Sequence, residues 1–132
     1  MIKEIEKYKM YQLTKNTIIL CNNSEIKYKL ISEFADEIND IINIKTIVTY
    51  KPTSIYLIDN EQKFIVTTEA PFILKCNNPY DLWFCDMNNK NEIQLWSFVE
   101  FKEYKQIWDK GIEEVYKEVI NGRFGCYEGY GR

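Results

Sequence analysis

All five glycines of this 132-residue chain lie within its last 22 residues, so residues 1–110 contain none. Phosphate-binding loops and nucleophile elbows need glycine where the backbone φ is positive or where the backbone touches a ligand. P-loop, Rossmann and nucleophile-elbow motifs are therefore absent from the body of the chain. We expect neither nucleotide-dependent chemistry nor a bound cofactor.

Histidine is also absent. Its absence removes imidazole bases, Ser-His-Asp and Cys-His pairs, and every metal site that relies on imidazole. The 20 acidic residues stand against 17 basic ones, which gives a net charge of −3. Such a balance indicates neither a polybasic nucleic-acid surface nor an acidic mimic of nucleic acid. We expect no catalytic residues, no metal and no nucleic-acid partner.

The content of 45% hydrophobic and 15% aromatic residues is enough for a packed core. No break in composition precedes residue 122, so we expect one globular domain over residues 1–121 and a Gly/aromatic tail over residues 122–132. No signal peptide or membrane span is visible in the sequence, which favours a cytoplasmic protein. Four cysteines without a C-x-x-C pair are then expected to be reduced thiols: Cys21, Cys76, Cys85 and Cys126.

The first third of the chain predicts a helix, a hairpin and a second helix. Residues 2–14 fit a short helix, although part of this segment also alternates as a strand. Residues 17–21 and 26–30 read as two strands joined by a polar turn. Ser32 is then placed to cap a helix that runs to about Asn43.

The middle of the chain shows strand patterns and little helical periodicity. We expect strands at residues 45–50, 54–59 and 63–68, and an extended segment at residues 72–76 between Pro71 and Pro79. Residues 81–86 and 92–96 flank a polar turn and predict one more hairpin, with Trp83 and Trp96 as partners across it.

Ser97 and Glu100 form an S-x-x-E capping box directly after this hairpin, which predicts a helix start. Apolar residues then recur at helical spacing from Phe101 to Val119 and form one stripe. Gly111 can divide this stripe into two helices. Asn121 and Gly122 are a natural C-terminal stop.

Together these elements predict the α+β class. We expect a single antiparallel sheet of about five to seven strands, with the internal helix and a C-terminal helix or broken helix pair packed on one face. Parallel βαβ order is not expected, because too few helices separate the strands.

Large aromatic and acidic residues are the candidates for a binding surface. If only one face of the sheet is covered, Trp83 lies on the open face, where an aromatic side chain makes a good interface anchor. Core packing is the competing interpretation for Trp83 and its neighbours. The acids of the last helix can form a solvated face or meet a basic groove, and the tail can order on a partner. The candidate partner-binding residues are Tyr80, Trp83, Trp96, Glu113, Glu114, Phe124, Tyr127 and Tyr130.

A second class of function would use carboxylates, tyrosines or a cysteine. Asp59, Asp81 and Asp86 end predicted strands, where carboxylates can act as acid and base or simply hold turns. Tyr104 and Tyr116 would line a pocket between the sheet and the last helix. The pair Cys76 and Cys85 could be a redox pair or two core residues.

These features favour a small intracellular protein-binding module that acts by stoichiometric occupation of a partner protein, and not an enzyme. An immunity protein, an inhibitor or a phage anti-defence protein fits the small size. Ile, Lys and Asn are abundant, which suggests an AT-rich coding sequence; low-GC bacteria, their plasmids and phages, and some viruses have such sequences. The partner is unidentified, no membrane is involved, and the chain itself is a monomer or a small homo-oligomer. The alternative is a small ligand-binding domain or a carboxylate-based enzyme with that sheet–helix pocket.

Overall fold

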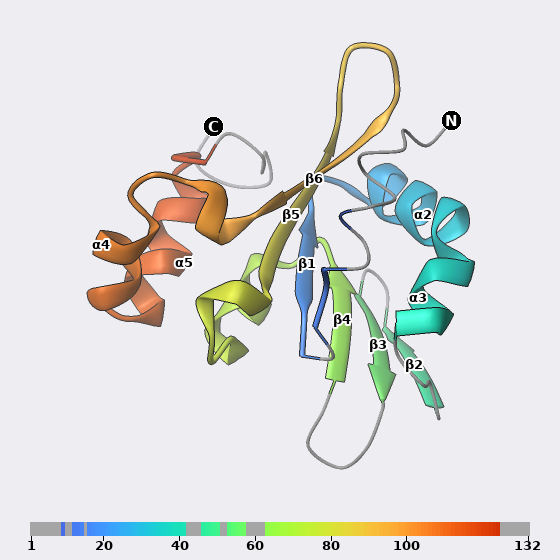
Figure 1. Ribbon diagram of the computed structural model, residues 1–132, viewed down its shortest axis with the longest axis horizontal. Helices are drawn as coiled ribbons and strands as arrows, with labels where there is room; N and C mark the ends of the chain where they lie inside the picture. Colours follow the sequence, from blue (N-terminus) through green and yellow to red (C-terminus); the bar gives the residue numbers. More distant parts are fainter. Residues whose placement is uncertain are drawn as a thin grey trace.

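The computed structural model describes residues 9, 12–14, 16–41, 46–50, 53–57 and 63–124. Its elements form one mixed sheet with helices around it (Figure 1). In chain order these are β1 Ile18–Cys21, α2 Ser24–Glu33, α3 Ala35–Ile41, β2 Thr46–Tyr50, β3 Thr53–Leu57, β4 Lys63–Thr67, η1 Ala70–Lys75, η2 Pro79–Asp81, β5 Leu82–Met87, β6 Ile93–Ser97, η3 Phe98–Glu100, α4 Tyr104–Asp109 and α5 Ile112–Ile120, where η marks a 3₁₀ helix. The α+β class is therefore confirmed.

The sheet has six strands in the order β2-β3-β4-β1-β5-β6. Strand β1 is parallel to both of its neighbours, β4 and β5, and the remaining pairs are antiparallel. The expectation of an antiparallel sheet was therefore wrong. The error arose at residues 22–30, which were read as a turn and a strand. A helix in this segment lets the chain leave β1 and return to the sheet with the same strand direction.

Residues 24–33, expected to hold the second strand of a hairpin, form helix α2. The side chain of Asn23 accepts a hydrogen bond from the backbone N–H of Ile26 at 2.9 Å and caps the helix. Ile26 and Leu30 lie one helical turn apart and both are buried, which the alternating pattern had concealed. Ser32 lies inside α2 and is not the helix cap that we expected. Helix α2 ends at Glu33, and Phe34 separates it from α3.

Helices cover both faces of the sheet, not one as expected (Figure 1). Successive strand residues point to opposite faces. Ile19, Cys21, Trp83 and Cys85 join the core cluster that includes residues of α2 and α3. Ile18, Leu20, Leu82 and Phe84 join the cluster that includes residues of η1, α4 and α5.

The strands expected in the middle of the chain are confirmed as β2, β3 and β4, and the last hairpin as β5 and β6. Trp83 faces Ser97 and Phe84 faces Trp96 in this hairpin, so the two tryptophans point to opposite faces and are not partners. The segment expected to be extended, residues 72–76, lies mostly in η1. Pro71 occupies the first turn of η1, where its missing N–H costs nothing.

The capping box at Ser97 and Glu100 is present, but it begins only the short turn η3. The apolar stripe then divides between α4 and α5 at Gly111, whose φ of 108° suits glycine. Helix α5 ends at Ile120 with Asn121 as its C-cap, and Gly122 follows with φ 78°. The split and the stop were thus predicted, whereas the helix start was placed too early.

Phe124, assigned to the tail, packs on the body of the domain. Its ring contacts those of Phe84, Phe98 and Phe101, with centroid distances of 5.7, 5.6 and 4.7 Å. Residues 125–132 lie outside the described residues, so the domain boundary at residue 122 stays a prediction.

Replacing Phe124 by alanine should destabilise the fold by about 2 kcal/mol, because three aromatic contacts and a half-buried ring are lost. Arg123→Ala is the matched control: its exposed ion pairs with Glu103 and Glu118 contribute little to stability, so this variant should unfold at nearly the same urea concentration as the unchanged chain. Urea unfolding followed by circular dichroism measures both. Equal stability of Phe124→Ala and the unchanged chain would show that the ring does not belong to the folded domain.

Lys27 is a buried cation in α2, with only 2% of its surface exposed. Its Nζ lies 5.1 Å from the centroid of the Tyr28 ring. Burial lowers the pKa of Lys27 from its ordinary value, and the nearby Cys21 opposes this change. Burial therefore makes the charged form costly in the native state.

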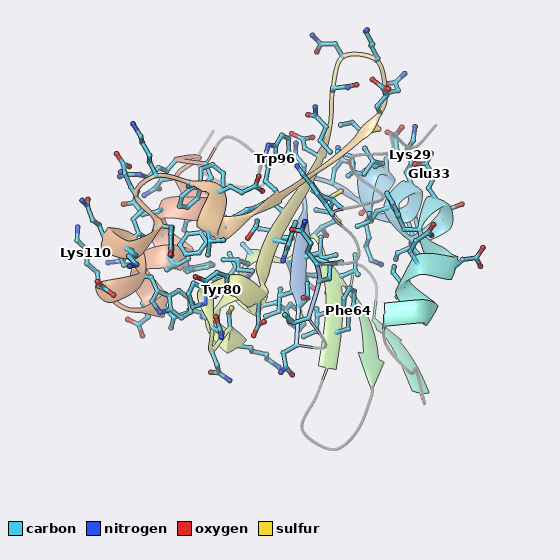
Figure 2. All side chains as sticks on the ribbon, viewed as in Figure 1. Lys29, Glu33, Phe64, Tyr80, Trp96 and Lys110 are labelled. Atoms are coloured by element: carbon cyan, nitrogen blue, oxygen red, sulfur yellow. The ribbon has the colours of Figure 1, made fainter. Side chains whose placement is uncertain are left out.

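Lys27→Met should raise the free energy of unfolding by about 1 kcal/mol at pH 7, since it removes this cost and keeps the apolar stem. Between the lowered pKa and the ordinary one, the unfolded chain binds more protons at Lys27 than the native protein does. The stability of the unchanged chain should rise with pH across that window, and the advantage of Lys27→Met should shrink. Denaturant titrations at pH 7 and pH 10 measure both effects, with Lys110→Met as control, because the Lys110 side chain is exposed (Figure 2). A loss of stability in Lys27→Met at pH 7 would contradict this account.

Candidate functional site

The candidate partner-binding residues fall into separate places. Tyr80 and Trp83 meet at one pocket. Trp96 and Phe124 pack against the core on the opposite face of the sheet. Glu113 and Glu114 lie in the first turn of α5, the former exposed and the latter half-buried. Tyr127 and Tyr130 lie outside the described residues.

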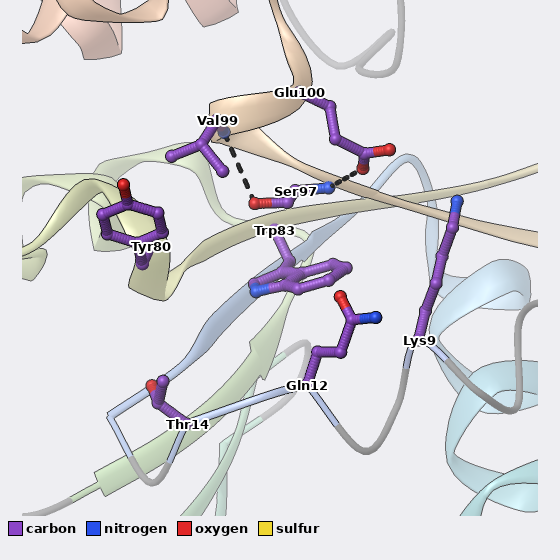
Figure 3. A pocket seen from close by; sticks show the side chains of 8 residues that line it. All are labelled: Lys9, Gln12, Thr14, Tyr80, Trp83, Ser97, Val99 and Glu100. Atoms are coloured by element: carbon purple, nitrogen blue, oxygen red, sulfur yellow. Dashed lines mark hydrogen bonds between the residues drawn. The ribbon is translucent and has the colours of Figure 1, made fainter.

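The pocket has a volume of about 640 Å³ and is lined by residues from four segments (Figure 3). One wall comes from the segment before β1, and the others come from η2, the β5–β6 hairpin and η3. The lining residues are Lys9, Gln12, Thr14, Tyr80, Trp83, Ser97, Val99 and Glu100. Of these residues, only Tyr80 and Trp83 were predicted to be binding residues. Ser97 and Glu100 were recognised only as a helix cap, and Lys9, Gln12 and Thr14 reach the pocket only through the tertiary structure.

The segment before β1 is fastened to the sheet by side-chain hydrogen bonds. Thr14 Oγ1 donates to Asp81 Oδ1 at 2.5 Å, and the backbone N–H of Thr14 donates to Thr17 Oγ1 at 2.9 Å. Lys9 Nζ donates to the Leu95 carbonyl oxygen at 2.7 Å. These bonds hold one wall of the pocket against β5 and β6.

The opposite wall is the capping box. The backbone N–H of Ser97 donates to Glu100 Oε2 at 2.6 Å, and that of Val99 donates to Ser97 Oγ at 3.4 Å (Figure 3). Lys9 and Glu100 therefore both line the pocket with their charged ends already engaged.

Tyr80 forms the rim. Its side chain is 56% exposed, and η2 presents it because Asn78 Oδ1 accepts the Tyr80 N–H at 3.0 Å and caps that turn. A side-chain hydrogen bond with Tyr80 raises the pKa of Tyr104 from its ordinary value. Tyr104 thus touches the rim residue but is not among the residues that line the pocket.

Trp83 carries the most unusual group of the site. Only 4% of the residue is exposed, and its indole Nε1 is buried without a hydrogen-bond partner among the described residues. Buried indole N–H groups usually find an acceptor. The expectation of an exposed anchor on an open sheet face was therefore wrong: Trp83 is a core residue that also lines the pocket, and its indole N–H has no acceptor among the described residues.

The carboxylates considered for an enzyme have structural partners. Asp81 accepts the hydrogen bond from Thr14, while Asp86 Oδ1 accepts from Asn22 Nδ2 at 3.1 Å and from the Met87 N–H at 2.8 Å. Tyr116 packs against the η1–α5 core, away from the pocket lining. Asp59 lies outside the described residues.

The cysteines do not form a reactive pair in this fold. Cys76 and Cys85 belong to the core clusters on opposite faces of the sheet. Burial raises the pKa of the Cys76 thiol to about 11; a backbone hydrogen bond with Asn78 opposes this change and nearby Asp81 adds to it. The thiol is therefore protonated, and poorly nucleophilic, at neutral pH.

Comparison of the sequence with protein-family models and with curated proteins found no match, and comparison with solved structures found none either. Over the described ranges, no helix has the length and apolar character needed to cross a membrane. Nor do three or more His, Cys, Asp or Glu side chains gather there into a group that could hold a metal ion.

Cys21, Cys76 and Cys85 should react slowly with iodoacetamide at pH 8, because all three are buried and the Cys76 thiol is protonated. Mass spectrometry of a Cys126→Ser variant measures the labelling, and the same variant in denaturant should label at all three positions. Rapid labelling of Cys76 in the native protein would contradict its placement in the core.

Proposed function

We propose that this protein is a non-catalytic binding module that acts by stoichiometric occupation of a partner protein, and that the pocket is the centre of its contact surface. The observation that carries the proposal is the position of Tyr80, an exposed aromatic residue, at the rim of a preformed cavity walled by Trp83. Aromatic side chains beside such cavities are enriched among residues that dominate binding energy.

The state of the polar groups supports binding over catalysis. Asp81 and Asp86 are engaged in structural hydrogen bonds, and the Cys76 thiol has a raised pKa where a nucleophile needs a lowered one. The described cysteines are thiols and not disulfides, which supports the proposed cytoplasmic location. Immunity proteins, inhibitors and phage anti-defence proteins are the kinds of binding module we favour.

A small-ligand-binding protein is the second candidate. The pocket volume of about 640 Å³ lies within the range of small-molecule sites, roughly 300–1,000 Å³. Native mass spectrometry separates the candidates: a partner protein adds its own mass at a fixed ratio, whereas a small ligand adds a few hundred daltons at most.

Site-specific photo-crosslinking tests the contact surface. Benzoylphenylalanine at position 80 should capture the partner at least about tenfold more efficiently than the same residue at position 28, since only the former lies at the pocket. Tyr28 is the matched control, because it is equally exposed at 56% and lies on α2. Capture that is equal at both positions, or absent at position 80 in a complex of fixed stoichiometry, would contradict the proposal.

A further inference from the structure

The pocket wall contains one buried polar group that the described part of the fold leaves without a hydrogen bond. Nε1 of Trp83 is buried and has no partner among the described residues. Leaving such a donor without an acceptor destabilises the folded state, so structures rarely keep one without a use. In Figure 3 the indole nitrogen lies on the edge of the ring turned to Tyr80 and Thr14, away from Lys9.

The other polar lining groups restrict what can meet this donor. The Lys9 ammonium donates to Leu95 and the Glu100 carboxylate accepts from Ser97, so both charges are engaged. The Gln12 carboxamide is exposed and has no side-chain hydrogen bond within the described part of the chain. With both charges engaged, the neutral Trp83 N–H and the neutral Gln12 amide remain for recognition, beside the hydroxyl groups of the lining.

A peptide unit has the matching chemistry. Its carbonyl oxygen can accept from the indole N–H, and an amide can both donate to and accept from Gln12. The apolar surfaces of Trp83 and Val99 suit the side chain that the peptide unit carries. A free carboxylate or ammonium would be buried without an unengaged counter-charge, which is costly.

We propose that the pocket binds a peptide segment of the partner protein, with an apolar side chain against Trp83 and the adjoining backbone carbonyl accepting a hydrogen bond from Trp83 Nε1. This inference rests on the proposed function and adds the chemistry of the bound segment. Tyr80 lies at the same end of the pocket and is more than half exposed. Because Nε1 is buried, the carbonyl reaches it only after a neighbouring side chain rotates, and exposed side chains such as Tyr80 rotate within nanoseconds.

The indole N–H resonances of the three tryptophans provide a direct readout. Trp96→Phe and Trp108→Phe each remove one peak and thereby assign that of Trp83. Titration with N-acetyl-phenylalanine N-methylamide, a minimal peptide unit, should move the Trp83 peak saturably downfield. Propylbenzene, which keeps the ring but lacks the amide, should bind without that downfield shift.

Two variants test the hydrogen bonds themselves. Trp83→Phe should weaken binding of the amide probe by about fivefold and leave propylbenzene binding within about twofold, because it removes the donor and keeps an aromatic wall. Gln12→Leu, at an exposed position that leaves the fold intact, should weaken the amide probe by a smaller factor. Exposed Lys110→Met is the control and should change neither probe.

Failure of this inference can be told apart from failure of the proposed function. A partner captured at position 80, combined with a Trp83 peak that does not move in the complex, overturns the hydrogen bond and leaves the function standing. A Trp83 peak that moves with the amide probe, in a protein for which position 80 captures no partner, supports the peptide site and contradicts the function. An amide probe that fails to bind up to its solubility limit, or binds the Trp83→Phe variant equally well, overturns the inference.

Discussion

The pairing of β1 with β4 and β5 is the constraint on which the rest of the structure depends. All four residues of β1 are at most 3% exposed, and both edges of the strand are hydrogen-bonded to parallel neighbours. Alternate side chains supply the cores on the two faces of the sheet. Because parallel neighbours cannot be joined by a tight turn, the chain after Cys21 must leave the sheet, and α2 begins three residues later.

Two charged side chains of the pocket lining form hydrogen bonds with the outer edge of β6. Lys9 donates a hydrogen bond to the Leu95 carbonyl, and Glu100 accepts one from the Ser97 N–H. Leu95 and Ser97 are alternate residues of β6, so their backbone N–H and C=O groups point to the same side of the strand, which here is the side away from β5. A sheet edge is a template for pairing with other chains, and charged side chains are a common way to cover it. The two charged residues of the pocket lining, Lys9 and Glu100, therefore cover the outer edge of β6.

Much of the fold could be read from local patterns, and its long-range order could not. The strands of the middle segment, the last hairpin, the capping box and the break at Gly111 all follow from chemistry within a few residues. The hairpin assigned to residues 17–30 failed because Ile26 and Leu30 fit both a strand and a helix, while Asn23 was read as a turn residue and not as a cap. The uninterrupted apolar run of residues 18–21, typical of a strand buried on both faces, was the signal of a parallel neighbour.

Of the site, Tyr80 and Trp83 were named from the sequence. Their pocket also needs Lys9, Gln12 and Thr14, which only the tertiary structure brings near.

The pocket itself follows from a conflict between capping and packing at Ser97. The sheet register places Ser97 directly opposite Trp83, on the same face. An apolar side chain there would fill the space beside the indole, but the start of η3 needs a small hydroxyl residue that can accept the Val99 N–H. The serine leaves room that neither α2 nor the segment before β1 fills, and the indole N–H is left without an acceptor beside that room. The residue that caps η3 thus also leaves the space beside Trp83 that becomes part of the pocket.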